Sequence, residues 1–343
     1  MRNILVVTTI NDESHKGIIK LIQNTDVQDY ELIIVGDEKT KLNLDTIKQP
    51  KVSYWNIENQ LNSHFLSGNL LPVNHYARKN FGYLVAAELG AEWISETDDD
   101  NLLYDKFWDF QEFDSRIINV KDDKWINIYS SFGHPEIWHR GIPINELHNS
   151  NNTHEELLNK VGELVCIQGL ANGDPDIDAI CRIIYKPNVE FQTDKSFLLG
   201  NQEYCPTNSQ LTRWKTLFTL PLLYLPSTVP WRVSDIWRGF IAQRFFSHNG
   251  FETQFRGGIG FQDRNQHDLL KDFIDEYPVH TMTDKLISIL EFVELEDPYE
   301  YMEFVYRKLI GIKLVEEAEM QILIGWLEDV KSILKKGLNQ NEP

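Results

Sequence analysis

The chain has few cysteines and few basic residues for its length. Among its 343 residues there are three cysteines, Cys166, Cys181 and Cys205, and no pair has CxxC spacing. This odd number, without metal-ligand spacing, is atypical of a disulfide framework or a zinc site, so we expect buried, reduced thiols. Acidic residues outnumber basic ones by 52 to 33, and the formal net charge is −19. Nucleic-acid binding depends on clustered lysine and arginine, so this balance makes a nucleic-acid partner improbable.

Long apolar runs and a secretory leader are also missing. The most apolar segment, residues 217–225, is interrupted by Pro221 and is far shorter than the roughly 20 residues of a membrane span. The first residues lead directly into a strand-like run without a cleavage site. We therefore predict a soluble, cytoplasmic protein with no membrane span. A hydrophobic content of 42% is sufficient for a large core in one or two domains.

The N-terminal part of the chain has the pattern of a parallel α/β sheet. Short apolar runs at residues 4–7 and 32–35 flank a segment with helical periodicity at residues 14–22, which predicts a β-α-β unit. No GxGxxG follows the first run, so NAD or FAD is not indicated. Ligands of such sheets bind at the carboxyl ends of the strands, although the polar residues there also fit ordinary turns. The candidates for base and ribose contacts are Thr8, Thr9, Asn11 and Asp37.

Three consecutive aspartates, Asp98, Asp99 and Asp100, follow a strand-like segment at residues 93–97. In an extended backbone, residues i and i+2 point to the same side, so Asp98 and Asp100 converge while Asp99 faces away. Adjacent carboxylates repel one another, and a divalent cation relieves this repulsion. Hard oxygen ligands suit Mg²⁺ or Mn²⁺, with water and phosphate oxygens completing the coordination. The triplet therefore predicts a metal-bound diphosphate, and the alternative is a solvated acidic turn.

A helix predicted over residues 71–90 precedes the aspartates and contains the cationic pair Arg78 and Lys79. Gly90 fits the C-terminal cap of this helix. The two cations are placed to contact a diphosphate that the metal also holds. The alternative is an ordinary solvated helix face.

Aromatic residues, glycine and proline are concentrated in a loop at residues 130–143. Aromatic rings beside polar groups form surfaces on which a sugar packs, so Trp138 is a candidate for a sugar contact. The same composition also builds loops that pack on a core.

Asp174, followed by proline, predicts the start of a helix with Asp174 as its N-cap. Two further acidic residues, Asp176 and Asp178, fall in the first turn of that predicted helix, where the helix dipole favours them. No catalytic role is needed to explain them.

Late in the chain, an aspartate stands between two arginines. Ser234 is a good N-cap, which places Asp235 at a helix start with Arg232 and Arg238 on either side. A carboxylate in this position stays ionised, which suits a base, a nucleophile or an electrostatic stabiliser rather than an acid. The alternative is an aspartate that caps the helix and forms salt bridges.

These motifs occur together in a known arrangement. The matching segments are residues 7–11, 35–37, 74–75, 78–84, 97–101, 133 with 135 and 137–138, 173–176 and 232–239. In this combination the chain resembles the STELLO family of glycosyltransferases, from the N-terminus to about His280. The set around Arg78 and the aspartates also resembles the plant reversibly glycosylated polypeptides, which act as sugar-nucleotide mutases.

Both resemblances imply a GT-A fold, a Rossmann-like, mostly parallel sheet flanked by helices. We expect this nucleotide-sugar-binding and catalytic domain over residues 1–280 and a helical C-terminal extension over residues 281–343. The family's DXD motif, Asp-x-Asp, matches Asp98 and Asp100 as ligands of Mn²⁺ or Mg²⁺, and the comparison suggests a late histidine as a further ligand, His267 in preference to His248. It also matches Asp235 to the catalytic carboxylate. The expected nucleotide-sugar contacts are Thr8, Thr9, Asn11, Asp37, Arg78, Lys79, Asp99, Trp138, Arg232 and Arg238.

The resemblance implies a metal-dependent glycosyltransferase that moves a sugar from a nucleotide-sugar donor, typically a nucleoside diphosphate sugar, to an unknown sugar or glycan acceptor. The alternatives are a sugar-nucleotide mutase and a catalytically inactive nucleotide-sugar-binding protein. Two features depart from the family pattern. Plant members have an N-terminal membrane anchor in the Golgi, which this sequence lacks, and Glu96 stands unexplained inside a predicted buried strand.

Overall fold

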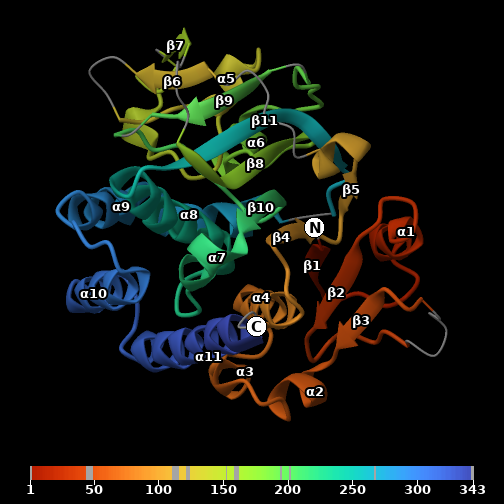
Figure 1. Cartoon of the computed structure of the whole chain (residues 1–343). Helices are drawn as coiled ribbons and strands as arrows, with labels where there is room; N and C mark the ends of the chain where they lie inside the picture. The colour runs from red at the N-terminus through yellow and green to blue at the C-terminus, as the bar shows by residue number, and fades with distance from the viewer. Residues whose placement is uncertain are drawn as a thin grey trace. The chain divides into compact units, whose positions relative to one another are not determined.

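The structure is a computed structural model of the chain (Figure 1). It describes residues 2–43, 49–109, 116–120, 124–151, 153–157, 162–193, 195–200, 202–265 and 268–340. The contacts within the chain define two compact units. Unit 1 comprises Met1–Asp100, Arg213–Ser234 and Asp297–Pro343, and unit 2 comprises Asn101–Thr212 and Asp235–Glu296.

Unit 1 contains a parallel sheet with the strand order β3-β2-β1-β4. Its strands are β1 (Asn3–Thr9), β2 (Glu31–Gly36), β3 (Val52–Trp55) and β4 (Trp93–Asp98). The apolar runs of β1 and β2 are buried, as expected for strands covered on both faces. Thr8 pairs with Asp98 in the ladder between β1 and β4, so these residues are neighbours at the carboxyl ends of their strands.

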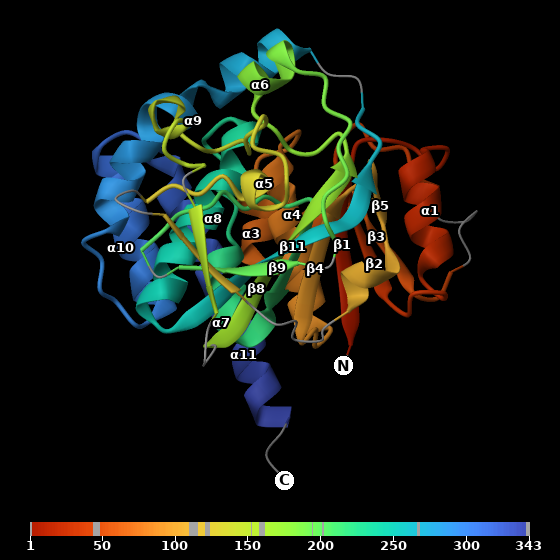
Figure 2. The same ribbon diagram turned by 90° about the horizontal axis from the view of Figure 1, so that it is seen from above.

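Helices α1 (Lys16–Asn24) and α4 (Lys79–Glu88) lie on opposite faces of this sheet in both views (Figures 1 and 2). Gly82 permits the close approach of α4, because a Cβ there would lie 2.5 Å from Val6 Cγ1 and 2.8 Å from Val35 Cγ2. The shorter helices of unit 1 are α2 (Ile57–Leu61), α3 (Leu66–Leu70), η2 (Tyr76–Arg78), α7 (Thr216–Thr219) and η5 (Leu220–Leu223).

The helix predicted over residues 71–90 is shorter than expected, since a 3-10 turn begins at Tyr76 and α4 at Lys79. Asn74 has a φ of +54°, outside the right-handed helical region. The end of the helix agrees with the prediction, because Gly90 has a φ of +81° and follows the last turn.

The C-terminal helices α10 (Pro298–Gly311) and α11 (Ala318–Gln340) belong to unit 1. The Asp329 carboxylate accepts hydrogen bonds from the backbone N–H of Leu66 and of Ser67, each at 2.9 Å, and so caps α3. The predicted helical C-terminal part is therefore confirmed. The predicted boundary at residue 280 lies inside α9 (Leu269–Leu290), and the division into domains stays a prediction.

Unit 2 contains a mixed sheet with the strand order β8-β11-β9-β6-β7, and β5 pairs with β11. These strands are β5 (Asn101–Leu103), β6 (Arg116–Val120), β7 (Thr153–Leu157), β8 (Glu163–Gly173), β9 (Ser196–Leu199) and β11 (Phe251–Gln262). Strand β11 runs parallel to β8 and antiparallel to β9 and β5. Strand β6 runs parallel to β9 and antiparallel to β7.

The helices assigned to unit 2 are η3 (Asp105–Trp108), α5 (Ile128–Ser131), η4 (Ile144–Glu146), α6 (Ala179–Ile184) and α9. Strand β10 (Leu211–Lys215) and helix α8 (Trp231–His248) contain points where the chain passes between the units. An aromatic-rich core that includes Phe132, Phe191 and Phe197 is buried in unit 2. The predicted α/β class with a mostly parallel sheet and flanking helices is confirmed by these elements.

Two further predicted helix starts are wrong. The helix predicted to begin after Asp174 begins at Ala179, and its N-cap is Asp178. An isolated bridge between Ile177 and His139 keeps the preceding segment extended. Ser234 is not an N-cap, because α8 begins at Trp231 and the Ser234 hydroxyl donates a hydrogen bond to the Pro226 carbonyl oxygen at 2.6 Å.

All three cysteines are buried free thiols, as predicted. In the part of the chain that the structure describes, no helix has the length and apolar character needed to cross a membrane.

Candidate functional site

The end of β4 in unit 1 brings together several of the predicted residues. The Asp98 side chain is 28% exposed, whereas the Lys79 side chain beside it is fully buried. Asp98 Oδ1 accepts hydrogen bonds from the Tyr76 hydroxyl at 2.6 Å and from Lys79 Nζ at 3.0 Å. Lys79 therefore lies close to the aspartates, as its predicted role requires, but here it pairs with a carboxylate.

Asp99 is buried and differs in this respect from its two neighbours. Its Oδ2 accepts hydrogen bonds from Thr9 Oγ1 at 2.5 Å and from Asn11 Nδ2 at 2.8 Å. The Asp99 carbonyl oxygen lies only 1.7 Å from the position that a Cβ would take at Gly17, so only glycine fits there. Thr9 and Asn11, predicted to contact a base or ribose, hold the aspartate turn in this structure.

The extended-strand reason for pairing Asp98 with Asp100 is wrong, because β4 ends at Asp98 and the next two residues form a turn. The expected difference in exposure nevertheless occurs. Asp98 and Asp100 are both partly exposed, while Asp99 faces inward. The two outer carboxylates therefore remain the candidates for a ligand.

The donor set fits the implied Mn²⁺ or Mg²⁺. Asp98 and Asp100 offer hard carboxylate oxygens with partial access to solvent, and such ions retain water and phosphate ligands beside one or two carboxylates. The repulsion among the aspartates is already reduced, however, because Lys79 pairs with Asp98 and Thr9 donates to Asp99. Charge repulsion thus supports a metal less strongly than the sequence alone indicates.

Asp37 holds a loop rather than facing outward. Its Oδ1 accepts hydrogen bonds from the backbone N–H of Asn74 and of Glu38, both at 2.8 Å, and its Oδ2 accepts from the N–H of His75 at 3.1 Å. These bonds fix the chain just before η2. A nucleotide contact by Asp37 stays a prediction.

Arg78 lies in the interior, although the sequence predicts that it contacts a diphosphate. It is 1% exposed, and its guanidinium donates to Gln60 Oε1 at 2.7 Å, to the Leu71 carbonyl oxygen at 2.8 Å and to the Gly68 carbonyl oxygen at 3.0 Å. Burial lowers the pKa of Arg78, while Asp37 raises it by a smaller amount. Arg78 therefore supports the loops before α4 and does not form a solvent-facing cation.

Glu96, unexplained in the sequence, has two buried partners. It is fully buried in β4, its Oε1 accepts a hydrogen bond from Trp214 Nε1 at 2.7 Å, and its Oε2 accepts one from the Tyr83 hydroxyl. A buried carboxylate is tolerated when its oxygens are hydrogen-bonded. Glu96 thus links β4 to α4 and β10.

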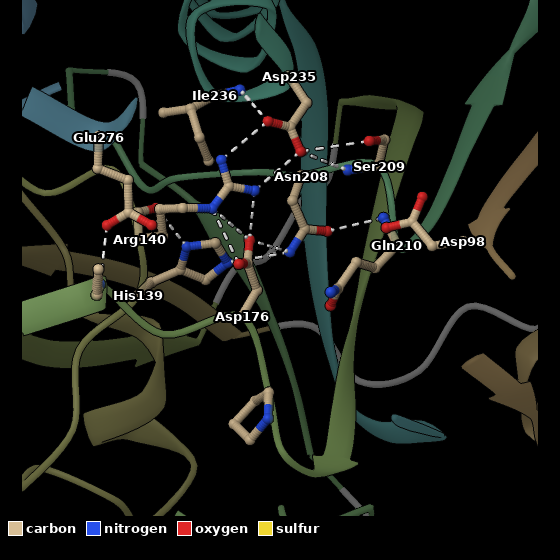
Figure 3. Close-up of polar contacts among 12 residues, drawn as sticks. Asp98, His139, Arg140, Asp176, Asn208, Ser209, Gln210, Asp235, Ile236 and Glu276 are labelled. Atoms are coloured by element: carbon tan, nitrogen blue, oxygen red, sulfur yellow. Dashed lines mark hydrogen bonds and ion pairs between the residues drawn. The ribbon is translucent and has the colours of Figure 1, made fainter. Parts of the chain in front are cut away.

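Unit 2 contains a buried ionic cluster centred on Arg140 (Figure 3). Arg140 Nη1 and Nη2 donate to the two carboxylate oxygens of Asp235, each at 3.0 Å. Arg140 Nε and Nη2 also donate to Asp176, at 2.9 and 2.7 Å. Burial lowers the pKa of Arg140, but the two aspartates raise it by more, and it lies well above its ordinary value. One guanidinium therefore holds two buried carboxylates.

Neutral groups complete this cluster. Asn208 Nδ2 donates to Asp176 Oδ2 at 3.0 Å, and the Ser209 backbone N–H donates to Asp235 Oδ2 at 3.3 Å. His139 Nδ1 lies 2.6 Å from the Arg140 carbonyl oxygen, which can only accept, so this nitrogen has the proton. Burial lowers the pKa of His139 and favours its neutral form.

One partner of Asp235 is not among those predicted. Arg232 lies with its guanidinium 5.3 Å from the Trp231 ring centroid, and Arg238 donates to the Asn208 carbonyl oxygen at 3.4 Å. The bidentate partner is Arg140, which the sequence did not suggest, because it lies 95 positions from Asp235. The role of Asp176 was also missed, and its only signal was its place in the matching segment at residues 173–176.

Trp138 is partly buried and packs against the aromatic-rich core of unit 2. This position agrees with the alternative of a loop packed on a core, and the sugar contact stays a prediction. His267, the suggested further metal ligand, lies outside the described residues.

Parallel strands with carboxylates at the end of β4 define the chain as an α/β protein with a candidate ligand site at a strand terminus. The model of the family described as STELLO glycosyltransferases matches residues 232–337. The chain is 24% identical over 291 residues to "Probable glycosyltransferase STELLO1" and 26% identical over 354 residues to "Probable glycosyltransferase STELLO2", both of Arabidopsis thaliana. Together these matches show that the chain is similar to the STELLO family and confirm the resemblance seen in the sequence.

The matches to the relatives cover 77% and 95% of this chain but only 36% and 44% of the relatives' own lengths. The chain therefore spans less than half of the curated relatives it matches. A solved structure titled "Crystal Structure of a Mycobacterial Protein" is similar over 81% of this chain and 72% of its own, with 11% identity and a TM-score of 0.40. A similarity this low carries no argument about function.

Proposed function

We propose that this chain is a metal-dependent glycosyltransferase that transfers a sugar from a nucleoside diphosphate sugar to an acceptor. The observation that carries the proposal is the partly exposed pair Asp98 and Asp100 at the carboxyl end of β4, in a chain matched by the STELLO family. Parallel α/β sheets bind ligands at this end of their strands.

In this proposal Asp98 and Asp100 hold Mn²⁺ or Mg²⁺, which supplies charge stabilisation for the departing nucleoside diphosphate. Thr9 and Asn11 keep the Asp99 turn in place, so the flanking carboxylates are pre-oriented. Lys79 Nζ lies 3.0 Å from Asp98 Oδ1 and its side chain is fully buried, so in this proposal its positive charge stabilises a bound diphosphate at a distance rather than by contact. Interactions of these residues with the nucleotide-sugar donor are part of the proposal.

A catalytically inactive nucleotide-sugar-binding protein is the second candidate. The environment of Asp235, the predicted catalytic carboxylate, favours this second candidate. Both Asp235 oxygens accept hydrogen bonds from Arg140, and the residue is 5% exposed. A general base needs a lone pair that faces the acceptor. The two candidates share the nucleotide site and differ in turnover.

The binding test is calorimetric titration of nucleoside diphosphates with and without Mn²⁺. We expect the wild-type affinity to fall at least about tenfold without the ion, and Asp98→Ala and Asp100→Ala to remove most of this dependence. Asp99→Asn has a smaller effect on the metal dependence, because this side chain faces inward. Asp26→Ala, at an exposed aspartate of unit 1, is the matched control and retains the full dependence.

Equal nucleotide affinity with and without Mn²⁺ in the wild type would overturn the metal-dependent form of the proposal. A screen of nucleotide sugars for hydrolysis and transfer then separates the enzyme from the inactive binding protein. An isomerised nucleotide sugar, formed without added acceptor and without release of the nucleoside diphosphate, would instead identify a sugar-nucleotide mutase.

A further inference from the structure

Three ligand-type side chains of unit 2 converge where α6 begins. Asp178 is the N-cap of α6, and Glu276 and His280 lie on α9 at i and i+4, on one face of that helix. Their candidate ligand atoms all lie within 4.8 Å of one another. Asp178 and Glu276 are fully buried, and the His280 side chain is 7% exposed.

One oxygen of each carboxylate is fixed by the backbone. Asp178 Oδ1 accepts a hydrogen bond from the N–H of Ile180 at 2.8 Å, and Glu276 Oε2 accepts one from the N–H of Ala179 at 2.8 Å. The two carboxylates are therefore held in place by neighbouring residues of the same helical turn. Such fixed carboxylates are suited to a ligand set that requires defined geometry.

Three other atoms of the cluster lack hydrogen bonds. Asp178 Oδ2 and both ring nitrogens of His280 are buried and have no hydrogen-bond partner among the described residues. His280 Nε2 lies at ion-pair distance, 3.1 Å, from Asp178 Oδ2, although the angle at the ring N–H is outside hydrogen-bond limits. Burial lowers the pKa of His280, and the neighbouring Asp178 raises it by more. Buried polar atoms nearly always form a hydrogen bond. Two such atoms that lie close together without one therefore indicate a bound group, such as a metal ion, between them.

We propose that Asp178, Glu276 and His280 bind one divalent first-row transition ion of the zinc type. Zinc binds both imidazole nitrogens and Asp or Glu oxygens, and the imidazole disfavours Mg²⁺ and Ca²⁺, which prefer oxygen ligands alone. Bonds of about 2.0 to 2.2 Å place neighbouring ligand atoms roughly 3 to 3.5 Å apart around a tetrahedral ion. The 3.1 Å separation of Nε2 and Oδ2 falls within this range.

The ion would join α9 to the segment that leads into α6. That segment contains Asp176, whose carboxylate accepts hydrogen bonds from Arg140. By fixing this segment, the ion would also stabilise the position of the ionic cluster around Arg140. Its role is structural, because none of its ligands belongs to the proposed metal site at Asp98 and Asp100. The inference is therefore independent of the proposed function.

The test uses the full chain, stripped of metal with a chelator and titrated with Zn²⁺ against a chromogenic zinc indicator. We expect one tight Zn²⁺ per wild-type chain, an affinity at least about tenfold lower in His280→Gln, and no displacement by equimolar Mg²⁺. Zinc should raise the melting temperature of the wild type and leave that of His280→Gln unchanged.

Two further variants keep the test decisive where His280→Gln folds poorly. Asp178→Asn retains an oxygen that caps α6, and Glu276→Gln retains an oxygen for the Ala179 N–H, so both remove charge while preserving these backbone bonds. Both should lose the tight zinc. The control His248→Gln, at an exposed histidine, should retain it.

Asp98→Ala separates this inference from the proposed function. That variant should lose metal-dependent nucleotide binding and keep the tight zinc, whereas His280→Gln should show the reverse. Equal zinc affinity and equal thermal shifts in the wild type and in His280→Gln would overturn the inference. The cluster would then be an ion pair between Asp178 and a protonated His280.

Discussion

The negative charge of the aspartates at the end of β4 is compensated differently from that of the aspartates around Arg140. In unit 1, Asp98 is partly exposed and one of its oxygens meets Lys79 and Tyr76. In unit 2, Asp176 and Asp235 are buried and share a single guanidinium. A partly exposed carboxylate can exchange its partner for a ligand at small cost, whereas breaking a buried ion pair costs about 3–5 kcal/mol.

The comparison assigns different tasks to residues that look alike in sequence. Aspartates beside basic residues occur in both regions, but exposure decides whether the pairing is exchangeable. The Asp98 end of β4 is suited to binding a charged ligand. The Arg140 cluster is suited to holding the surrounding loops, because Arg140 joins residues 36 and 95 positions away along the chain.

The largest effect is expected for Arg140→Met. Removing the guanidinium takes the positive charge of Arg140 away from the buried carboxylates of Asp176 and Asp235, which destabilises the fold by about 3–5 kcal/mol. Denaturant unfolding of the variant and the wild type measures this free energy. The control is Arg116→Met, which breaks the exposed ion pair with Glu155 in the same unit and should change it by less than about 1 kcal/mol. Similar losses in both variants would contradict the comparison.

An intermediate effect is expected for Asp235→Asn. The amide preserves the shape but removes one charge facing Arg140, while Asp176 remains, so we expect a loss of about 1–3 kcal/mol. A catalytic role would in addition lower turnover by roughly a hundredfold with nucleotide affinity near wild type. Asp176→Asn is the matched control, since it loses a charge to the same arginine. Equal turnover in the two variants would make Asp235 structural.

The smallest effect on stability is expected for Lys79→Met. Met fills the space of the buried Lys79 side chain and Asp98 retains Tyr76 and solvent, so the free energy of unfolding should fall by about 1 kcal/mol, the net contribution of one hydrogen bond. Removing the ammonium should strengthen Mn²⁺ binding several-fold and weaken nucleotide binding without metal. Calorimetry measures both, with Tyr76→Phe as the control that leaves the charge in place. Unchanged Mn²⁺ affinity would show that the ion does not bind beside Asp98.

Local patterns in the sequence were sufficient for the elements that depend on near neighbours. The apolar runs of β1 and β2, the Gly90 cap and the C-terminal helices all follow from periodicity and capping chemistry over a few residues. The inward position of Asp99 also agreed with the pattern, although the strand geometry given as its reason did not.

Tertiary structure alone decided the partners of the buried charges. Glu96 looked misplaced because its partners Tyr83 and Trp214 lie 13 and 118 positions away. Arg140 and Asp176 carried no local signal for the same reason. A hydrogen bond between distant residues depends on how strands and helices align in three dimensions, and local hydrophobic periodicity contains no information about that alignment.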